Sequence, residues 1–487
     1  MAYFVDESVK HLLRRAGFGA NKEDLGYYGE LRFDDAVRLL VDFEQIDDDV
    51  DGKIGNAAYA GVTVRGGFQP NTVVNDARQR WLFRMVHSNR PLQEKLTLFW
   101  HNHFATAYSK LAGAYGTADG TRLMAAKPSE DPAGLEGQVE TIRRMAVGSF
   151  RDLVIAMAKD PAMLIWLDGR YNTKTKPQEN FGRELMELFS MGVGFYTESD
   201  VYAAARVFTG WNLTRTATSA TDPYPSYKFA YNASLHETAA KTLSFPIYTD
   251  GSRTIPSRSA DAGLRDGIDL ITAVVRHPET ARRLVGRLWS FLVSEMNEPS
   301  ETFLAAATRQ YLTTDYNIRG VLDMMLRSPE FRDERQYFTK YSWPAEFIAR
   351  SIKEVGWAGF SVDTAVSQMI NMGQVLYEPP DVAGWEQGPG WISTGGMLAR
   401  MNFAAALAKS QVNGLAAWAK PYAREADAVL SATLDRLSPS PFGNAAYSDL
   451  RSYLIASGPW TGSDAQLRAK VPGLVHLIVG SGEYVFV

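Results

Sequence analysis

The sequence contains no cysteine among its 487 residues. This absence excludes disulfide bonds, thiol nucleophiles, zinc–thiolate sites and iron–sulfur clusters together, because each of them needs a cysteine sulfur. It does not identify a compartment, since a chain without cysteine tolerates reducing and oxidising surroundings alike.

An excess of one charge and long apolar runs are also missing. Lys plus Arg number 51 and Asp plus Glu number 55, which gives a formal net charge of −4. No basic stripe is present, so the composition argues against a nucleic-acid partner. Charges interrupt every apolar run within about ten residues, which predicts no membrane-spanning helix. Residues 1–7 lack the basic and apolar regions of a signal peptide, so the default expectation is a cytoplasmic location.

Several catalytic and nucleotide-binding signatures are absent as well. The sequence has no Gly-x-Gly-x-x-Gly after a strand, no Walker loop, no Gly-x-Ser-x-Gly elbow and no His-Glu-x-x-His. These absences leave nucleotide binding, serine-hydrolase and zincin chemistry without support.

Most of the chain carries apolar residues at helical spacing. Phe33–Val41 is one predicted helix, and another begins at Pro91 and runs to about Phe104. We therefore predict a mainly α-helical fold in a single multi-helix body. It divides into an N-terminal helical region (1–213), an irregular insertion with one hairpin (214–260) and a C-terminal helical region (261–487). Two further segments, 111–137 and the Gly/Pro/Trp-rich 378–394, are predicted loops, with two or three helices after the second.

A polar strip on the predicted helix 179–191 is the first candidate for chemistry. On a helical wheel Phe181, Leu185, Leu188 and Phe189 share one face. The opposite face carries Asn180, Arg183, Glu184 and Glu187. Two carboxylates three residues apart raise one another's pKa when partly buried, and Arg183 and Glu187 are spaced for an ion pair. The functional interpretation is an acid–base or metal-binding pair, and the alternative is a solvated helix face.

The second candidate is the segment His101-Asn102-His103. Helical geometry separates the two rings by about 200°, so they do not face one metal ion while the helix continues. His103 falls on the apolar stripe with Leu96 and Phe99, which predicts a buried, hydrogen-bonded histidine. His101 falls beside Glu94 and is the better candidate for exposure in a cleft.

Tryptophans mark the remaining candidates. Trp211 follows Gly210 at the expected mouth of the insertion, and Trp385 and Trp391 lie in the predicted loop 378–394, shortly before Arg400. Such rings stack on sugars or other flat ligands, or they anchor a long loop to the core. Both interpretations are open from the sequence.

Seven ordered motifs resemble one large bacterial family, catalogued as domain of unknown function 1800. They are His11–Gly19, Phe99–Phe104, Glu179–Phe189, Tyr196–Val201, Thr209–Trp211, His277–Arg282 and Glu378–Trp385. The resemblance covers nearly the whole chain and implies no settled activity. It implies an envelope or secreted setting and a sulfatase-like or phosphatase-like protein partner, and here the missing signal peptide departs from the family's exported members. The candidates His101, Arg183, Glu184 and Glu187 all lie inside these motifs.

Two hypotheses follow. In the first, the chain is a hydrolase or lyase acting on a glycan or other polar polymer, with His101, Arg183, Glu184 and Glu187 as its catalytic residues. The substrate-binding residues would then be His103, Asn180, Trp211, Trp385, Trp391 and Arg400. No cofactor is evident, and a divalent metal is a variant of this hypothesis. In the second, the chain is a non-catalytic binding or assembly partner of an envelope protein, and the polar cluster is a structural network.

Overall fold

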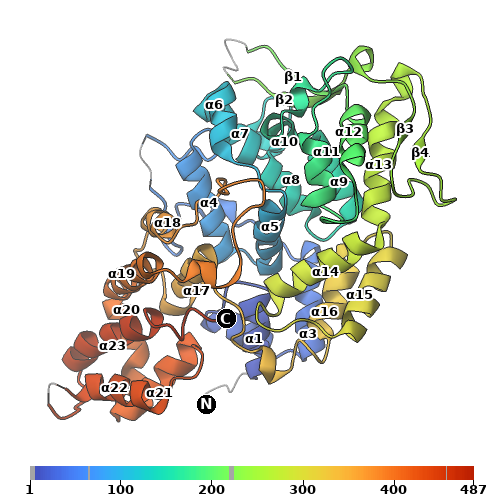
Figure 1. Cartoon of the computed structure of the whole chain (residues 1–487). Coiled ribbons are helices and arrows are strands. Elements are labelled where there is room, and N and C mark those ends of the chain that lie inside the picture. Colours follow the sequence, from blue (N-terminus) through green and yellow to red (C-terminus); the bar gives the residue numbers. More distant parts are fainter. Residues whose placement is uncertain (1–5, 64–65, 219–223, 457) are drawn as a thin grey trace.

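The computed structural model describes residues 6–63, 66–218, 224–456 and 458–487. Within these residues the chain forms 23 α-helices and only two small antiparallel sheets of two strands each. The predicted mainly α-helical fold with a short strand insertion is therefore confirmed (Figure 1).

The helices of the N-terminal half end where the insertion begins. They are α1 (Glu7–Arg15), α2 (Lys22–Gly29), α3 (Phe33–Val41), α4 (Val74–His87), α5 (Pro91–His103), α6 (Tyr108–Tyr115), α7 (Thr117–Ala125), α8 (Gln138–Met145), α9 (Phe150–Lys159), α10 (Pro161–Trp166), α11 (Asn180–Glu187) and α12 (Glu198–Val207).

All four named strands of the described chain lie within residues 211–255, so the strand region begins three residues before the predicted insertion (214–260) and holds two strand pairs where one hairpin was expected. Strands β1 (Trp211–Arg215) and β2 (Tyr227–Tyr231) pair antiparallel, with Trp211 opposite Tyr231. Strands β3 (Lys241–Thr242) and β4 (Thr254–Ile255) form the second pair. The alternating pattern of residues 227–231 thus forms the strand that its period of two predicts.

The second half returns to helices. They are α13 (Leu264–Arg276), α14 (Pro278–Leu292), α15 (Glu301–Thr313), α16 (Ile318–Arg327), α17 (Pro344–Val355), α18 (Val362–Asn371), α19 (Thr394–Ser410), α20 (Val412–Ala419), α21 (Ala426–Leu437), α22 (Asn444–Ile455) and α23 (Asp464–Val479). In the view of Figure 1, α14, α15 and α16 lie at the lower right and α21, α22 and α23 at the lower left.

Helix α5 is buried on all sides. It packs against α3, α4 and α8, and from Glu94 to His103 no residue of it is exposed. Its charged residues are matched inside the protein, since Lys95 contacts Glu346 of α17 and Glu94 binds Arg143 of α8. A helix of this kind offers no solvent face, whatever its sequence pattern suggests.

Two sequence expectations about loops and helix number are wrong. The segment 111–137 is not a loop, because α6 and α7 occupy much of it. Its small residues hide the helical pattern and allow close packing, and a Cβ atom at Gly120 would lie 2.8 Å from the backbone nitrogen of Ala112. After the loop 378–394 the described residues form five α-helices, not two or three. Within the described residues, no helix combines the length and the apolarity needed to cross a membrane.

Candidate functional site

Helix α11 has the two faces that its sequence predicts. Phe181, Leu185 and Phe189 are buried, whereas Glu184 and Glu187 are half-buried. The apolar face packs on α12, where a Cβ atom at Gly182 would lie 2.7 Å from that of Ala204. Close packing of the two helices therefore turns the polar strip away from the core. Asn180, at the start of the helix, is exposed.

The ion pair predicted between Arg183 and Glu187 is not the one that forms. Arg183 binds Glu198 at 2.6 Å and Glu179 at 3.3 Å. Glu198 begins α12, so the Arg183 side chain connects the two helices at the surface. Glu198 is exposed and Glu179 is partly exposed, and ion pairs of this kind contribute little to stability. Arg183 is thus a surface ion-pairing residue.

Glu184 and Glu187 form the acidic part of the strip. The Tyr196 hydroxyl donates a hydrogen bond of 2.5 Å to Glu187. Glu184 has no hydrogen bond or ion pair from its side chain within the described residues. Partial burial, with a smaller contribution from the neighbouring Glu187 carboxylate, raises the pKa of Glu184 to about 6. Glu184 therefore exchanges its proton close to neutral pH.

Arg283 of α14 reaches the end of α11, and Arg287 of the same helix lies near Arg283 and His103; the sequence did not single out either residue. Arg283 donates to the carbonyl oxygens of Leu188 at 2.6 Å and Ser190 at 3.1 Å, just beyond the end of α11. Arg287 lies one turn further along α14 and forms no hydrogen bond or ion pair within the described part of the chain. Burial, and secondarily Arg283, lowers the pKa of Arg287 to about 10. One sequence feature could have pointed to these two arginines, because the motif 277–282 precedes both of them on the same helix.

His103 lies beneath this face. It is buried, as predicted, and its Nε2 atom lies 3.1 Å from the carbonyl oxygen of Phe189. Burial lowers the pKa of His103 well below its usual range, and Arg287 and Arg283 add to the effect. His103 is therefore a neutral core residue that connects α5 to the end of α11, and it does not reach a ligand at the surface.

The expected exposure of His101 is wrong. Its ring is 0% exposed and lies 5.5 Å from the rings of both Trp81 and Trp385. Neither ring nitrogen has a hydrogen-bond partner among the residues that the structure describes, and burial lowers the pKa of His101 to about 3. The helical wheel fails here because a distant loop supplies Trp385 and covers the ring. His101 is thus not available as an acid–base partner of the α11 glutamates.

Asn102, between the two histidines, fixes the loop that covers His101. Its Oδ1 atom accepts from the Trp385 backbone N–H at 2.6 Å, and its Nδ2 atom donates to the Trp385 carbonyl oxygen at 3.3 Å. The preceding Gly384 has φ +88°, and a Cβ atom there would lie 2.2 Å from the Asn102 Oδ1 atom. Only glycine fits this close approach. This contact gives a structural reason for the presence of both motifs, Phe99–Phe104 and Glu378–Trp385, in one chain.

The expectation that tryptophans line a ligand rim is also wrong. Trp211, Trp385 and Trp391 are 1%, 5% and 7% exposed. Trp211 packs against Phe208, and Trp391 packs near Trp343. Arg400 is fully buried and donates from Nη1 to the Trp391 carbonyl oxygen at 2.9 Å. These residues anchor loops to the core, which was the structural alternative for them.

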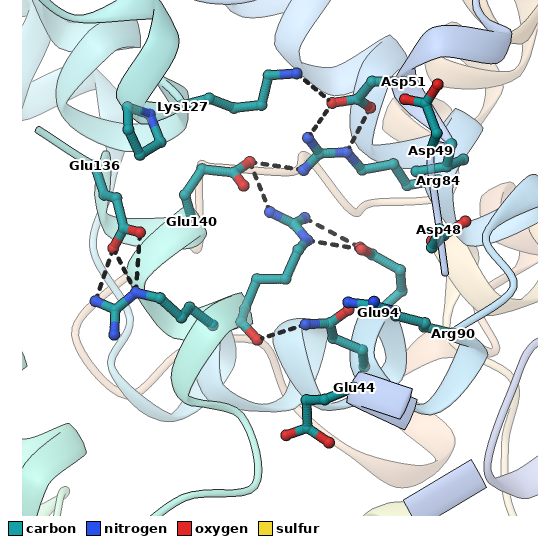
Figure 2. A pocket seen from close by; sticks show the side chains of 15 residues that line it. Glu44, Asp48, Asp49, Asp51, Arg84, Arg90, Glu94, Lys127, Glu136 and Glu140 are labelled. Atoms are coloured by element: carbon teal, nitrogen blue, oxygen red, sulfur yellow. Dashed lines mark hydrogen bonds and ion pairs between the residues drawn. The ribbon is translucent and has the colours of Figure 1, made fainter. Parts of the chain in front are cut away.

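A different cavity, of about 440 Å³, opens between α4, α5, α8 and the segment 44–51 (Figure 2). Sequence reasoning missed it. Its walls carry buried ion pairs: Arg84 binds Glu140 at 2.6 Å, and Arg143 binds both Glu140 and Glu94 at 2.7 Å. No aromatic residue lines it. The lining residues are Glu44, Asp48, Asp49, Val50, Asp51, Arg84, Arg90, Gln93, Glu94, Lys127, Pro128, Glu136, Glu140, Arg143 and Arg144.

Metal binding has a clear geometric requirement. Among the residues that the structure describes, no group of three or more His, Asp or Glu side chains is arranged to hold a metal ion. Within the described residues, Glu184 and Glu187 therefore lack a third protein ligand of this kind.

Comparison with known proteins identifies one family. A family model described as "Protein of unknown function (DUF1800)" matches residues 11–486. No curated protein and no solved structure matches the chain.

Proposed function

The chain belongs to the DUF1800 family, and we propose that it is a hydrolase or lyase acting on a polar, anionic polymer at the face formed by α11 and α14. The observation that carries the proposal is Glu184, a half-buried carboxyl group with a pKa of about 6 and no side-chain partner within the described residues. Acid–base catalysis is most efficient when the pKa of the group lies near the working pH.

The neighbouring residues suggest separate roles. Glu184 donates or accepts the proton at the bond that breaks. Glu187, held by the Tyr196 hydroxyl at 2.5 Å, orients the attacking water in a hydrolase or takes the substrate proton in a lyase. Arg287, whose guanidinium has no partner within the described residues, binds an anionic group of the substrate. Arg283, bound to two carbonyl oxygens, positions the end of α11.

The buried tryptophans change the kind of substrate that fits. Trp211, Trp385 and Trp391 do not offer stacking surfaces, so sugar rings find none of the platforms that the sequence suggested. An unpartnered arginine instead favours a substrate with a carboxylate or sulfate group. Acidic polysaccharides are therefore the first substrates to test.

The experiment compares matched variants on a panel of acidic polysaccharides. Reducing ends report hydrolysis, and ultraviolet absorbance of the unsaturated product reports elimination. We expect Glu184→Gln to lower kcat by about 10²–10⁴-fold, because it removes the proton-transferring group. Arg287→Gln should raise KM, whereas Arg282→Gln is the control on the same helix, since Arg282 pairs with Glu301 at the surface. Activity of Glu184→Gln equal to that of the unmodified chain would refute the assignment.

The alternative function is a non-catalytic partner of a sulfatase-like or phosphatase-like envelope protein, which the family resemblance implies. It is supported by motif residues that are buried in the core or fix a loop, among them His101 and Asn102. The same panel separates the two proposals. A chain that cleaves none of the substrates, but co-purifies with such a partner, would favour the non-catalytic role.

A further inference from the structure

The cavity between α4, α5 and α8 contains both paired and unpaired charges. Seven carboxylates and five basic groups line it. Five of the carboxylates form ion pairs, and the two exceptions within the described residues are Asp48 and Asp49. Asp48 accepts hydrogen bonds from the Ser88 hydroxyl at 2.5 Å and the Asn89 N–H at 3.2 Å, and Asp49 accepts one from the Gly52 N–H at 3.3 Å. Two negative charges at the cavity wall are thus uncompensated.

One cation of the lining is unpaired as well. Arg90 donates from Nε to the Ile46 carbonyl oxygen at 2.6 Å and forms no ion pair within the described part of the chain. Arg90 and Asp48 line the same cavity, and the Ser88 hydroxyl that donates to Asp48 also accepts from the Arg90 backbone N–H at 3.0 Å. The cavity lining therefore contains both a carboxylate and a guanidinium that have no ion pair within the described residues, and Figure 2 shows no contact between the two.

The other residues that line the cavity limit the kind of ligand that fits. Lys127 binds Asp51 at 2.8 Å and Arg144 binds Glu136 at 2.8 Å, so these groups still offer hydrogen bonds but no uncompensated charge. Because no aromatic ring lines the cavity, flat apolar ligands find no stacking surface. A volume of about 440 Å³ accepts a small polar molecule.

We propose that this cavity binds a free amino acid or a closely related zwitterion. The ammonium group would contact Asp48, the carboxylate would contact Arg90, and a polar side chain would contact the paired groups opposite. This site is separate from Glu184 and Arg287. The proposal therefore does not depend on whether the α11 face is catalytic.

The test is isothermal titration calorimetry of the full chain with a panel of the standard amino acids. We expect saturable binding of at least one polar amino acid. The amine obtained by removing its carboxylate, and the acid obtained by removing its ammonium group, should each bind at least about tenfold more weakly, because each loses one charged contact.

Matched variants locate the site. Asp48→Asn keeps an acceptor for Ser88 and Asn89, and Arg90→Lys keeps the positive charge, so both should fold. Each should weaken binding by about tenfold or more, because the ammonium loses its counter-charge or the carboxylate loses its planar donor. Glu136→Gln removes a carboxylate that lines the same cavity but is already paired, and binding should change less than about threefold.

Three results would overturn the proposal. The first is the absence of saturable binding by any amino acid. The second is binding of the amine as tight as that of its parent amino acid, which would indicate a simple cation site. The third is an equal loss of affinity in Glu136→Gln and Asp48→Asn, which would indicate a general effect of charge. Binding that survives in Glu184→Gln would confirm that the cavity acts independently of the α11 face.

Discussion

Replacing Glu184 by Gln should stabilise the protein at neutral pH. The pKa of Glu184 rises from 4.5 to about 6 on folding, mainly because the carboxyl group is partly buried. A rise of about 1.5 corresponds to about 2 kcal/mol against the ionised form. Because the side chain is only half-buried, solvent screening reduces this figure to about 0.5–1 kcal/mol. The substitution removes this unfavourable term, and within the described residues it breaks no hydrogen bond of the Glu184 side chain.

The effect should depend on pH with a definite sign. Between about pH 4.5 and pH 6 the folded chain holds the Glu184 proton while the unfolded chain releases it. The free energy of unfolding of the unmodified protein therefore falls as the pH rises through this window, and that of Glu184→Gln lacks this contribution. We expect the two proteins to be equally stable near about pH 4 and to differ by about 0.5–1 kcal/mol near about pH 7.5.

Urea denaturation at several pH values measures this difference, provided that the denaturant dependence is the same for both proteins. Glu198→Gln is the control, because Glu198 is exposed and ion-paired with Arg183. If Glu184 instead belonged to a structural network, the substitution would lower the free energy of unfolding by about 1–3 kcal/mol at neutral pH. Such a loss, or a difference independent of pH, would refute the reasoning.

Three further predictions concern residues that hold the fold together. Glu346→Gln should lower the free energy of unfolding by about 3–5 kcal/mol, because it leaves the buried ammonium groups of Lys95 and Lys340 without a carboxylate. A loss below about 1 kcal/mol, measured by urea denaturation, would contradict this prediction. His101→Phe should leave the melting temperature unchanged or raise it, because it removes two buried ring nitrogens that have no hydrogen-bond partner among the described residues. A marked fall in the melting temperature would show that His101 makes a polar contact. Asn102→Ala should lower the free energy of unfolding by about 2–4 kcal/mol, because two buried hydrogen bonds to the loop 378–394 are lost. It should also speed proteolysis within that loop. Equal proteolysis of both proteins would show that other contacts hold the loop.

The helices were predictable where one side of the element is solvated. Phe33–Val41 was predicted with the bounds that the structure has, because its apolar residues repeat with helical period and face the core. The same period gave the buried and polar faces of α11. In α6 and α7, small residues make many of the packing contacts. The sequence therefore shows no apolar stripe in this segment, and its pattern predicts a loop.

Tertiary neighbours were not predictable from periodicity. The wheel placed His101 beside Glu94, but whether that side meets water depends on α4 and on the loop that carries Trp385. In the same way, nothing local to α11 indicates that Arg283 lies against its end. The spacing of residues predicts a face of a helix, whereas the groups opposite that face come from distant parts of the chain.

The polar residues discussed above therefore divide by how their polar groups are used. Asn102 is fully engaged with the loop around Trp385, and Arg400 with backbone carbonyl oxygens. Fold maintenance accounts for both residues. Glu184 has no such use, and its raised pKa shows that the fold holds it at a cost in stability. Groups that destabilise a fold without a structural role are the ones expected to serve function. This contrast, more than membership of a motif, is what selects Glu184 for mutation.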